Sequence, residues 1–166
     1  MPGTVKQDDA PNCYIFIATG IDFEPFTTGF EITKALLANG AWLASPFTPY
    51  RRDYKQGDRA LFYVAGRGFR YVIGDAVLSG AVEEITKNDL RLAAKLGIEG
   101  FQQRIPLESI RLWEQGLSLQ PLVQTLEFIK DKKNWGLHFR QAATRIPAAD
   151  FETILKELHN GVVPSR

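Results

Sequence analysis

Aromatic and basic side chains gather in the stretch 42–74, at both ends of an expected β-hairpin. The loop 50–55 holds two tyrosines, two arginines and a lysine. The turn 66–68, Gly-Arg-Gly, can close the hairpin because glycine accepts positive φ without a Cβ clash. Flat rings beside guanidinium groups can grip a planar partner that carries negative charge. The alternative is that the strand aromatics simply form the core, which is their usual place.

The balance of charge is almost neutral, with a formal net charge of +1. This argues against a protein that coats nucleic acid through bulk charge. A guanidinium nevertheless pairs bidentately with a phosphate, so local basic clusters still matter. The side chains expected to contact a nucleic-acid backbone are Arg51, Arg52, Lys55, Arg67 and Arg140. For Arg140 the alternative is an ion pair with Asp150 or Glu152.

The length of 166 residues predicts one domain with its own core. We expect this domain to span residues 13–160, between a loose N-terminal tail, residues 1–12, and a C-terminal tail, residues 161–166. An apolar share of 45% and a charged share of 23% are ordinary for a soluble globular protein. No apolar run is long enough to cross a bilayer, so we expect a cytoplasmic protein without a membrane partner.

The residues that usually carry catalysis or bind metal are sparse. One cysteine and two histidines leave no internal disulfide and no zinc-like cluster. Two Asp-x-Lys triplets, at 53–55 and 131–133, echo part of a nuclease core, but neither has a Pro-Asp strand upstream. Hydrolase and phosphate-loop motifs are also missing from the sequence. We therefore expect no enzyme, no catalytic residue, no metal and no cofactor.

The first half of the chain is predicted to begin with a short buried strand at residues 14–18. A helix follows, which Thr27 or Thr28 can cap and which Asn39-Gly40 can end. Trp42 emerges directly from this helix end. The hairpin strands come next, with the return strand at residues 69–77 rich in β-branched and aromatic side chains.

Beyond the hairpin we expect a bulge at Gly80 and a strand continuing over residues 81–85. A short helix is predicted at residues 90–96, and Asn88 or Asp89 is positioned to cap it. These elements are punctuated by glycine, which favours short strands and short helices.

The remaining segments are predicted as strands at residues 101–105 and 107–113, separated at Pro106 because proline cannot donate to a ladder. Helices are expected after Ser118 and after Pro147, the second with apolar residues at helical spacing. Strands outnumber helices. The predicted class is α+β, a small, partly open β-barrel with peripheral helices.

Several of these segments match a known pattern in order. They are the strand 14–18, the helix after it, the turn Gly-Ala-Trp-Leu-Ala-Ser-Pro at 40–46, the strand entry Lys-Gln-Gly-Asp-Arg-Ala-Leu-Phe-Tyr at 55–63, the return strand at 69–74, and the Phe-Arg-Gln-Ala and Ile-Pro steps before the last helix. Over roughly residues 14–158 the chain resembles the PUA-like superfamily, and within it the EVE and YTH-like domains. The resemblance implies the small β-barrel described above.

The resemblance also implies a reader rather than a catalyst. Such domains extrude a modified base into an aromatic cage while basic loops hold the phosphates. The family's tryptophan after the first helix forms one cage wall, which corresponds to Trp42. For the second wall Tyr63, Phe101, Trp113 and Trp135 stay open. The expected pocket residues are Trp42, Ser45, Tyr63, Trp135 and Asp22.

The expected partner is DNA or RNA that carries a modified base, bound by a monomer that can act with an effector protein. One setting is the specificity domain of a modification-dependent restriction system. Two alternatives are a general RNA-binding domain of the PUA or ASCH type without modification specificity, and a protein-interaction module. The protein-interaction module is favoured if the aromatic side chains are buried.

Overall fold

The computed structural model describes residues 10–20, 28–66 and 69–160. The described residues form an α+β fold around a curled seven-stranded sheet. Six of the strands follow the order β2-β6-β4-β3-β1-β7, and the seventh, β5, pairs with β6. The strands are β1 (Cys13–Thr19), β2 (Ala41–Ala44), β3 (Arg59–Gly66), β4 (Phe69–Leu78), β5 (Glu83–Glu84), β6 (Gln103–Ser118) and β7 (Ala143–Ile146). The predicted fold class is confirmed.

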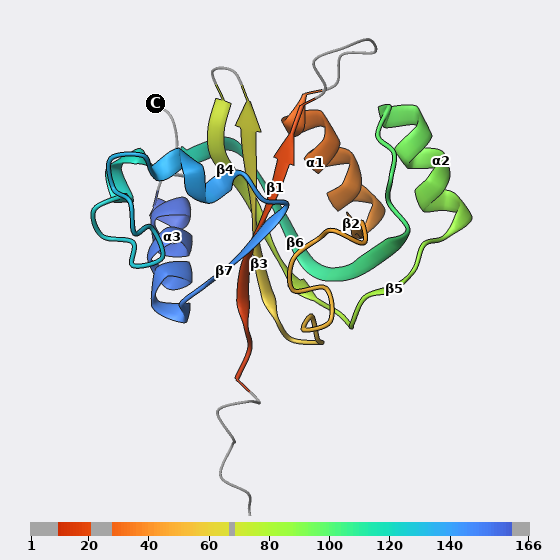
Figure 1. Ribbon diagram of the computed structural model, residues 1–166, viewed down its shortest axis with the longest axis horizontal. Coiled ribbons are helices and arrows are strands. Elements are labelled where there is room, and N and C mark those ends of the chain that lie inside the picture. The colour runs from red at the N-terminus through yellow and green to blue at the C-terminus, as the bar shows by residue number, and fades with distance from the viewer. Residues whose placement is uncertain (1–9, 21–27, 67–68, 161–166) are drawn as a thin grey trace, which may run out of the picture.

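Both faces of this sheet are covered (Figure 1). Helices α1 (Gly29–Asn39) and α2 (Lys87–Leu96) lie to one side, and α3 (Ala148–Asn160) with the segment 119–139 lies to the other. Successive side chains of β1 therefore enter different cores: Tyr14 and Phe16 join the α1 side, and Ile15 and Ile17 join the α3 side. Burial on both faces explains why β1 is a continuous apolar run.

The central strands include the predicted hairpin and a parallel pair that the sequence did not specify. β1 runs parallel to β3, with Tyr14 opposite Ala60, and β3 forms an antiparallel hairpin with β4. All three strands therefore lie in one curled sheet, in agreement with the predicted small barrel. Of the turn predicted at residues 66–68, residues 67 and 68 lie outside the described residues.

Helix α1 begins and ends at the predicted signals. Thr28 caps it, with its side chain accepting from the Glu31 amide while the Glu31 carboxylate accepts from the Thr28 amide. Gly40 ends it with φ of 80°, a left-handed conformation that glycine adopts without strain. The chain then passes directly into β2, which carries Trp42.

The predicted break at Pro106 is wrong, because β6 runs through it as one 16-residue strand. Pro106 sits where β6 changes partner: residues 103–106 pair with β2, and residues 107–118 pair with β4. The Pro106 carbonyl still accepts from the Ser79 amide at 2.9 Å. A proline fits here since the ladder requires no donor from it at the change of partner.

Two predictions just after the hairpin are also wrong. β4 ends at Leu78, and instead of a strand over residues 81–85 the chain has only the two-residue β5. The cap of α2 is Thr86, which forms a capping box with Asp89. Asp89 is thus the third residue of the helix rather than its cap.

The helix predicted after Ser118 is reduced to one 3₁₀ turn, η2 (Gln120–Leu122). Apolar residues at helical spacing are buried here without a helix, because side chains satisfy the backbone instead. The buried Asp150 carboxylate accepts from the Glu127 and Phe128 amides, and the Lys132 ammonium donates to two carbonyls. The segment then enters a second 3₁₀ turn, η3 (Trp135–Phe139). The predicted final helix is confirmed as α3.

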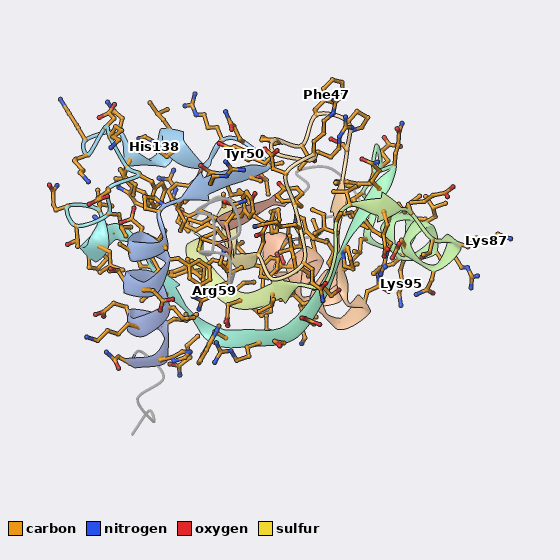
Figure 2. All side chains as sticks on the ribbon, turned by 90° about the horizontal axis from the view of Figure 1, so that it is seen from below. Phe47, Tyr50, Arg59, Lys87, Lys95 and His138 are labelled. Carbon is orange, nitrogen blue, oxygen red and sulfur yellow. The ribbon has the colours of Figure 1, made fainter. Side chains whose placement is uncertain are left out.

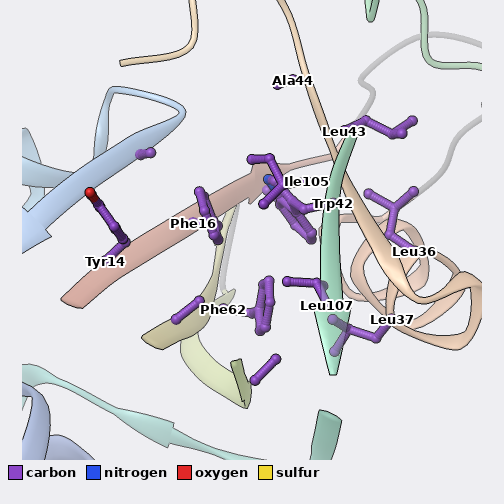
Figure 3. Close-up of a cluster of buried hydrophobic side chains, with 14 of the residues drawn as sticks. Tyr14, Phe16, Leu36, Leu37, Trp42, Leu43, Ala44, Phe62, Ile105 and Leu107 are labelled. Carbon is purple, nitrogen blue, oxygen red and sulfur yellow. The ribbon is translucent and has the colours of Figure 1, made fainter. Parts of the chain in front are cut away.

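Trp42 lies in the core, where its ring is not available as the cage wall that the resemblance implies (Figure 3). Only 5% of the residue is exposed. The indole packs against Phe16, with ring centroids 5.8 Å apart, and against Phe62 at 5.0 Å. The reason is pairing of β2 with β6, which aims Trp42 at the inside of the curled sheet.

Among the described residues, no helix combines the length and the apolar character that a membrane span requires.

Replacing Trp42 with Ala should lower the free energy of unfolding by about 3–5 kcal/mol, because it empties a well-packed site. Phe47→Ala is the matched control: Phe47 is 91% exposed, so its loss should change stability by less than about 0.5 kcal/mol. Urea denaturation of both variants measures the difference. Equal stabilities for the two variants would contradict the core assignment of Trp42.

Candidate functional site

One hollow brings aromatic and basic side chains together between the β3–β4 strands and η3. We call it the aromatic hollow; it encloses about 540 Å³, within the usual size range of ligand sites. Three rings and three cations dominate its lining: Tyr63, Trp135 and Phe139 with Arg70, Lys133 and Arg140.

The three rings form a stepped surface. Tyr63 and Phe139 are buried and stacked, with centroids 4.2 Å apart and planes 21° from parallel. Trp135 meets Phe139 edge to face, with centroids 5.9 Å apart and planes at 85°. Trp135 is only half-buried, so the rigid pair beneath it supports an accessible indole. This arrangement can receive a flat apolar group.

The three cations of the hollow are exposed. Within the part of the chain that the structure describes, no carboxylate forms an ion pair with Arg70, Lys133 or Arg140. The alternative partners considered for Arg140 are engaged elsewhere, since Asp150 holds two backbone amides and Glu152 pairs with Arg59. Positive charge therefore faces the hollow without internal neutralisation, which favours an anionic ligand.

Arg70 lies against the backbone of η3. A Cβ at Gly136 would come within 3.2 Å of the Arg70 Nη1 atom. The glycine thus leaves room for the guanidinium beside the indole of the preceding residue, Trp135. Sequence spacing alone gives no sign of this, because 65 positions along the chain separate Arg70 from Trp135.

Tyr63 carries a perturbed hydroxyl. Burial raises its pKa from the ordinary 10.0 to about 12, against the opposing charge of Arg70. The phenol therefore stays protonated across the physiological range, as a neutral ring in the hollow.

The basic loop 50–55 is held against β7 by Arg145. Its guanidinium lies 4.9 Å from the Tyr50 ring centroid, donates to the Tyr14 hydroxyl at 3.1 Å and reaches Asp53 at 3.3 Å. Tyr50 has φ of 62°, which is unusual outside glycine. These contacts fix the direction in which the loop presents Arg51 and Arg52, which line a separate hollow beside Gln103.

Three of the predicted site residues, Tyr63, Trp135 and Arg140, meet in the aromatic hollow. Trp42 does not join them. Ser45 is also elsewhere: its hydroxyl accepts from the Phe47 amide and stabilises the turn after β2. Asp22 and Arg67 lie outside the described residues.

The remaining predicted backbone contact, Lys55, serves the fold. Its ammonium forms a 2.6 Å ion pair with the fully buried Asp58 and also donates to the Ala10 carbonyl. Asp58 in turn accepts from the Lys55 and Asn12 amides, so the pair ties the strand entry to the start of β1. Lys55 is therefore less available to a phosphate than Arg51 or Arg52.

Sequence reasoning did not assign Arg70, Lys133 or Phe139 to the site. A partial signal was present, since Arg70 follows the hairpin turn and Lys133 precedes Trp135 in a polar segment. Phe139 gave none, because a phenylalanine next to an arginine is equally typical of core. The other candidate rings lie apart: Phe101 lines a hollow beside α2, and Trp113 donates to Asp75.

No family model matches the chain. Among curated proteins it is similar to the UPF0310 protein PH1033 of Pyrococcus horikoshii, with 36% identity over 63 residues, which is 37% of this chain and 42% of that protein. It is also similar to the UPF0310 protein PYRAB08750 of Pyrococcus abyssi, with 29% identity over 105 residues, or 60% and 72% of the two chains. The chain thus spans less than half of the first relative.

Solved structures resemble almost the whole fold. The YTH domain of Zygosaccharomyces rouxii MRB1, in complex with N6-methyladenosine RNA, superposes with a TM-score of 0.61 at 16% identity, covering 90% of this chain and 88% of that one. The fold is PUA-like. Human THYN1, in complex with DNA containing 5-methylcytosine, superposes with a TM-score of 0.57 at 12% identity, covering 89% of this chain and 97% of that one. The N-terminal domain of Thermococcus gammatolerans McrB, bound to m5C DNA, superposes with a TM-score of 0.56 at 15% identity, covering 91% of this chain and 99% of that one.

This PUA-like fold accounts for the order of elements around the hollow. The family resemblance implies a cage wall at the tryptophan after α1. In this chain that tryptophan, Trp42, packs in the core. The indole that lines the hollow is instead Trp135, on η3, which is only half-buried. Within the described residues no group of His, Cys, Asp and Glu is arranged to hold a metal ion.

The free energy of unfolding should fall at high pH because the Tyr63 phenol ionises less readily in the folded protein. Since its pKa is higher in the folded state, stability is fully present below pH 10.0 and falls as the pH rises to about 12. Burial also raises the pKa of Tyr14 and of Tyr54, so both add a fall of the same sign. Tyr63→Phe should therefore show a shallower loss of stability over this interval in urea titrations. Parallel curves for the two proteins would contradict the buried phenol.

Proposed function

We propose that this chain is a nucleic-acid-binding reader module that holds an extruded base in the aromatic hollow. The observation that carries the proposal is the meeting in one hollow of an accessible indole with three cations that form no ion pair within the described residues. Aromatic rings bind bases of any sequence through their faces, and the cations suit the flanking phosphates.

The energies are sufficient for such a role. Extruding a base costs a few kcal/mol, and less from a single strand. Stacking on an aromatic ring returns about 1–3 kcal/mol per base, and each unpaired cation adds salt-dependent attraction to phosphate. The stacked pair of Tyr63 and Phe139 keeps the floor rigid, so little conformational entropy is lost on binding.

A preference for a modified base is the finer part of the proposal. It is supported by the PUA-like fold, which this chain shares with proteins solved with N6-methyladenosine RNA or 5-methylcytosine DNA. A methyl group buried against the rings adds about 0.8 kcal/mol, or roughly fourfold in affinity. In this proposal Trp135 replaces Trp42 as the cage wall.

The phosphate path runs from the hollow along the edge strand β7. Arg140 precedes this strand, Arg145 lies on it, and the loop with Arg51 and Arg52 is bound to Arg145. In Figure 2, His138, Tyr50 and Phe47 follow one another along a single edge of the molecule, which places the two basic regions on the same side. A nucleic-acid strand leaving the hollow can follow this edge.

The biological setting is a further part of the proposal. Recognition by the module would serve a modification-dependent restriction system if an effector protein cuts the marked strand. Binding of unmarked RNA with equal affinity would favour the general RNA-binding alternative.

Binding should depend on Trp135 and Arg140 in different ways. The probes are fluorescein-labelled single strands: DNA with 5-methylcytosine, RNA with N6-methyladenosine, and their unmodified twins. Trp135→Ala should weaken the preferred marked strand by roughly 5- to 150-fold and remove the preference for the mark. Arg140→Ala should weaken marked and unmarked strands about equally and reduce the salt dependence of binding.

Arg91→Ala on α2 is the matched control for Arg140, because it removes the same exposed charge far from the hollow. Circular dichroism checks that each variant is folded. The proposal fails if none of the strands binds the wild-type protein, or if Arg140→Ala and Arg91→Ala behave alike.

A further inference from the structure

A second hollow adjoins the aromatic hollow and shares two residues with it. We call it the neighbour hollow; it encloses about 350 Å³ and is lined by Arg70, Tyr71, Ser118, Gln120 and Trp135. Trp135 and Arg70 also line the aromatic hollow. These two side chains therefore stand between the hollows, and each hollow has access to them.

Both shared side chains carry a planar group on which a base can stack. An indole stacks bases on its ring, and an arginine guanidinium offers a flat cation for the same purpose. A base held in the aromatic hollow on one side of this divider places the next nucleotide of its strand close to the other side. Arg70 is exposed and free of ion pairs among the described residues, so it can also accept the phosphate between the two nucleotides.

The neighbour hollow differs from the aromatic hollow in its polar side chains. Gln120 is exposed, and its backbone is fixed: its amide donates to the Ser118 hydroxyl at 3.3 Å, and its carbonyl accepts from the Val123 amide at 3.3 Å. The side-chain carboxamide makes no hydrogen bond to the rest of the described chain. It therefore presents a donor and an acceptor from a rigid turn, η2.

The sheet positions this polar pair. Ser118 is the last residue of β6 and pairs with Tyr71 of β4, directly beside Arg70. The serine oxygen that accepts from Gln120 keeps its own proton for donation. The edge of a base in the neighbour hollow would thus meet a hydroxyl and a carboxamide whose backbone is held on the sheet.

We propose that the neighbour hollow binds the nucleotide next to the extruded base and that Gln120 reads it, with a preference for adenine. The inference rests on the proposed function. On the base edge that carries N6 and N7, adenine offers a donor beside an acceptor, which a glutamine carboxamide matches in a bidentate pair, whereas guanine offers two acceptors, O6 and N7, on the same edge. The protein then recognises a two-nucleotide step, with the extruded base on one side of Trp135 and adenine on the other.

The test varies sequence context around a fixed central base. Labelled single strands carry the best-bound central base of the reader assay, with each of the four bases placed in turn at the 5′ neighbour and at the 3′ neighbour. The wild-type protein should prefer adenine at one of these positions by about fivefold or more, and show little preference at the other.

Gln120→Ala should abolish the adenine preference while leaving discrimination at the central base intact. Gln124→Ala is the matched control, since Gln124 is exposed on the same segment and lines neither hollow. It should keep the wild-type pattern. Trp135→Ala should lower affinity for all strands.

The outcomes separate this inference from the function on which it rests. Equal affinity for all neighbours, or an adenine preference that survives Gln120→Ala, overturns the inference and leaves the reader function standing. Failure of every strand to bind the wild-type protein overturns both.

Discussion

The double burial of the central strands β1 and β3 is the constraint on which the rest of the structure depends. A sheet covered on both faces must supply two separate cores from alternating residues. In β3, Phe62 packs with Trp42 on the α1 side, and the next residue, Tyr63, stacks on Phe139 on the α3 side. A shift of one residue would exchange these two rings and dismantle the core and the hollow together.

A β-bulge lies between β3 and β4 at the point where these two rings follow one another. The pairing of β3 with β4 shifts between Phe62 and Tyr63, so that Phe62 faces Gly74 and Tyr63 faces Val72. Gly74 is required here, because a Cβ at this position would lie 2.6 Å from the Arg111 carbonyl oxygen. The close approach of β6 at this glycine lets the sheet curl, and the curl encloses Trp42 on one side.

The other side of the site depends on an irregular segment, residues 119–139, rather than on a helix. Its apolar residues reach the core because Asp150 and Lys132 satisfy the backbone groups that a helix would have paired internally. This arrangement carries η2 and η3 to the same end of the β3–β4 strands. Gln120 and Trp135 thereby line the same neighbour hollow, although neither belongs to the sheet.

The sequence by itself determined the local elements and the class of fold. The capping signal at Thr28, the helix end at Gly40, the hairpin strands and the amphipathic α3 all depend on neighbours within a few residues, which is why they could be predicted. Only the tertiary structure decided which aromatic is accessible. Trp42 follows a helix end and Trp135 follows a pair of lysines, and neither local pattern tells whether the indole is buried. Their burial depends on distant partners: β6 aims Trp42 inward, whereas Phe139 and Arg70 support Trp135 at a rim. The passage of β6 through Pro106 was likewise decided by two sheet partners that no local pattern specifies.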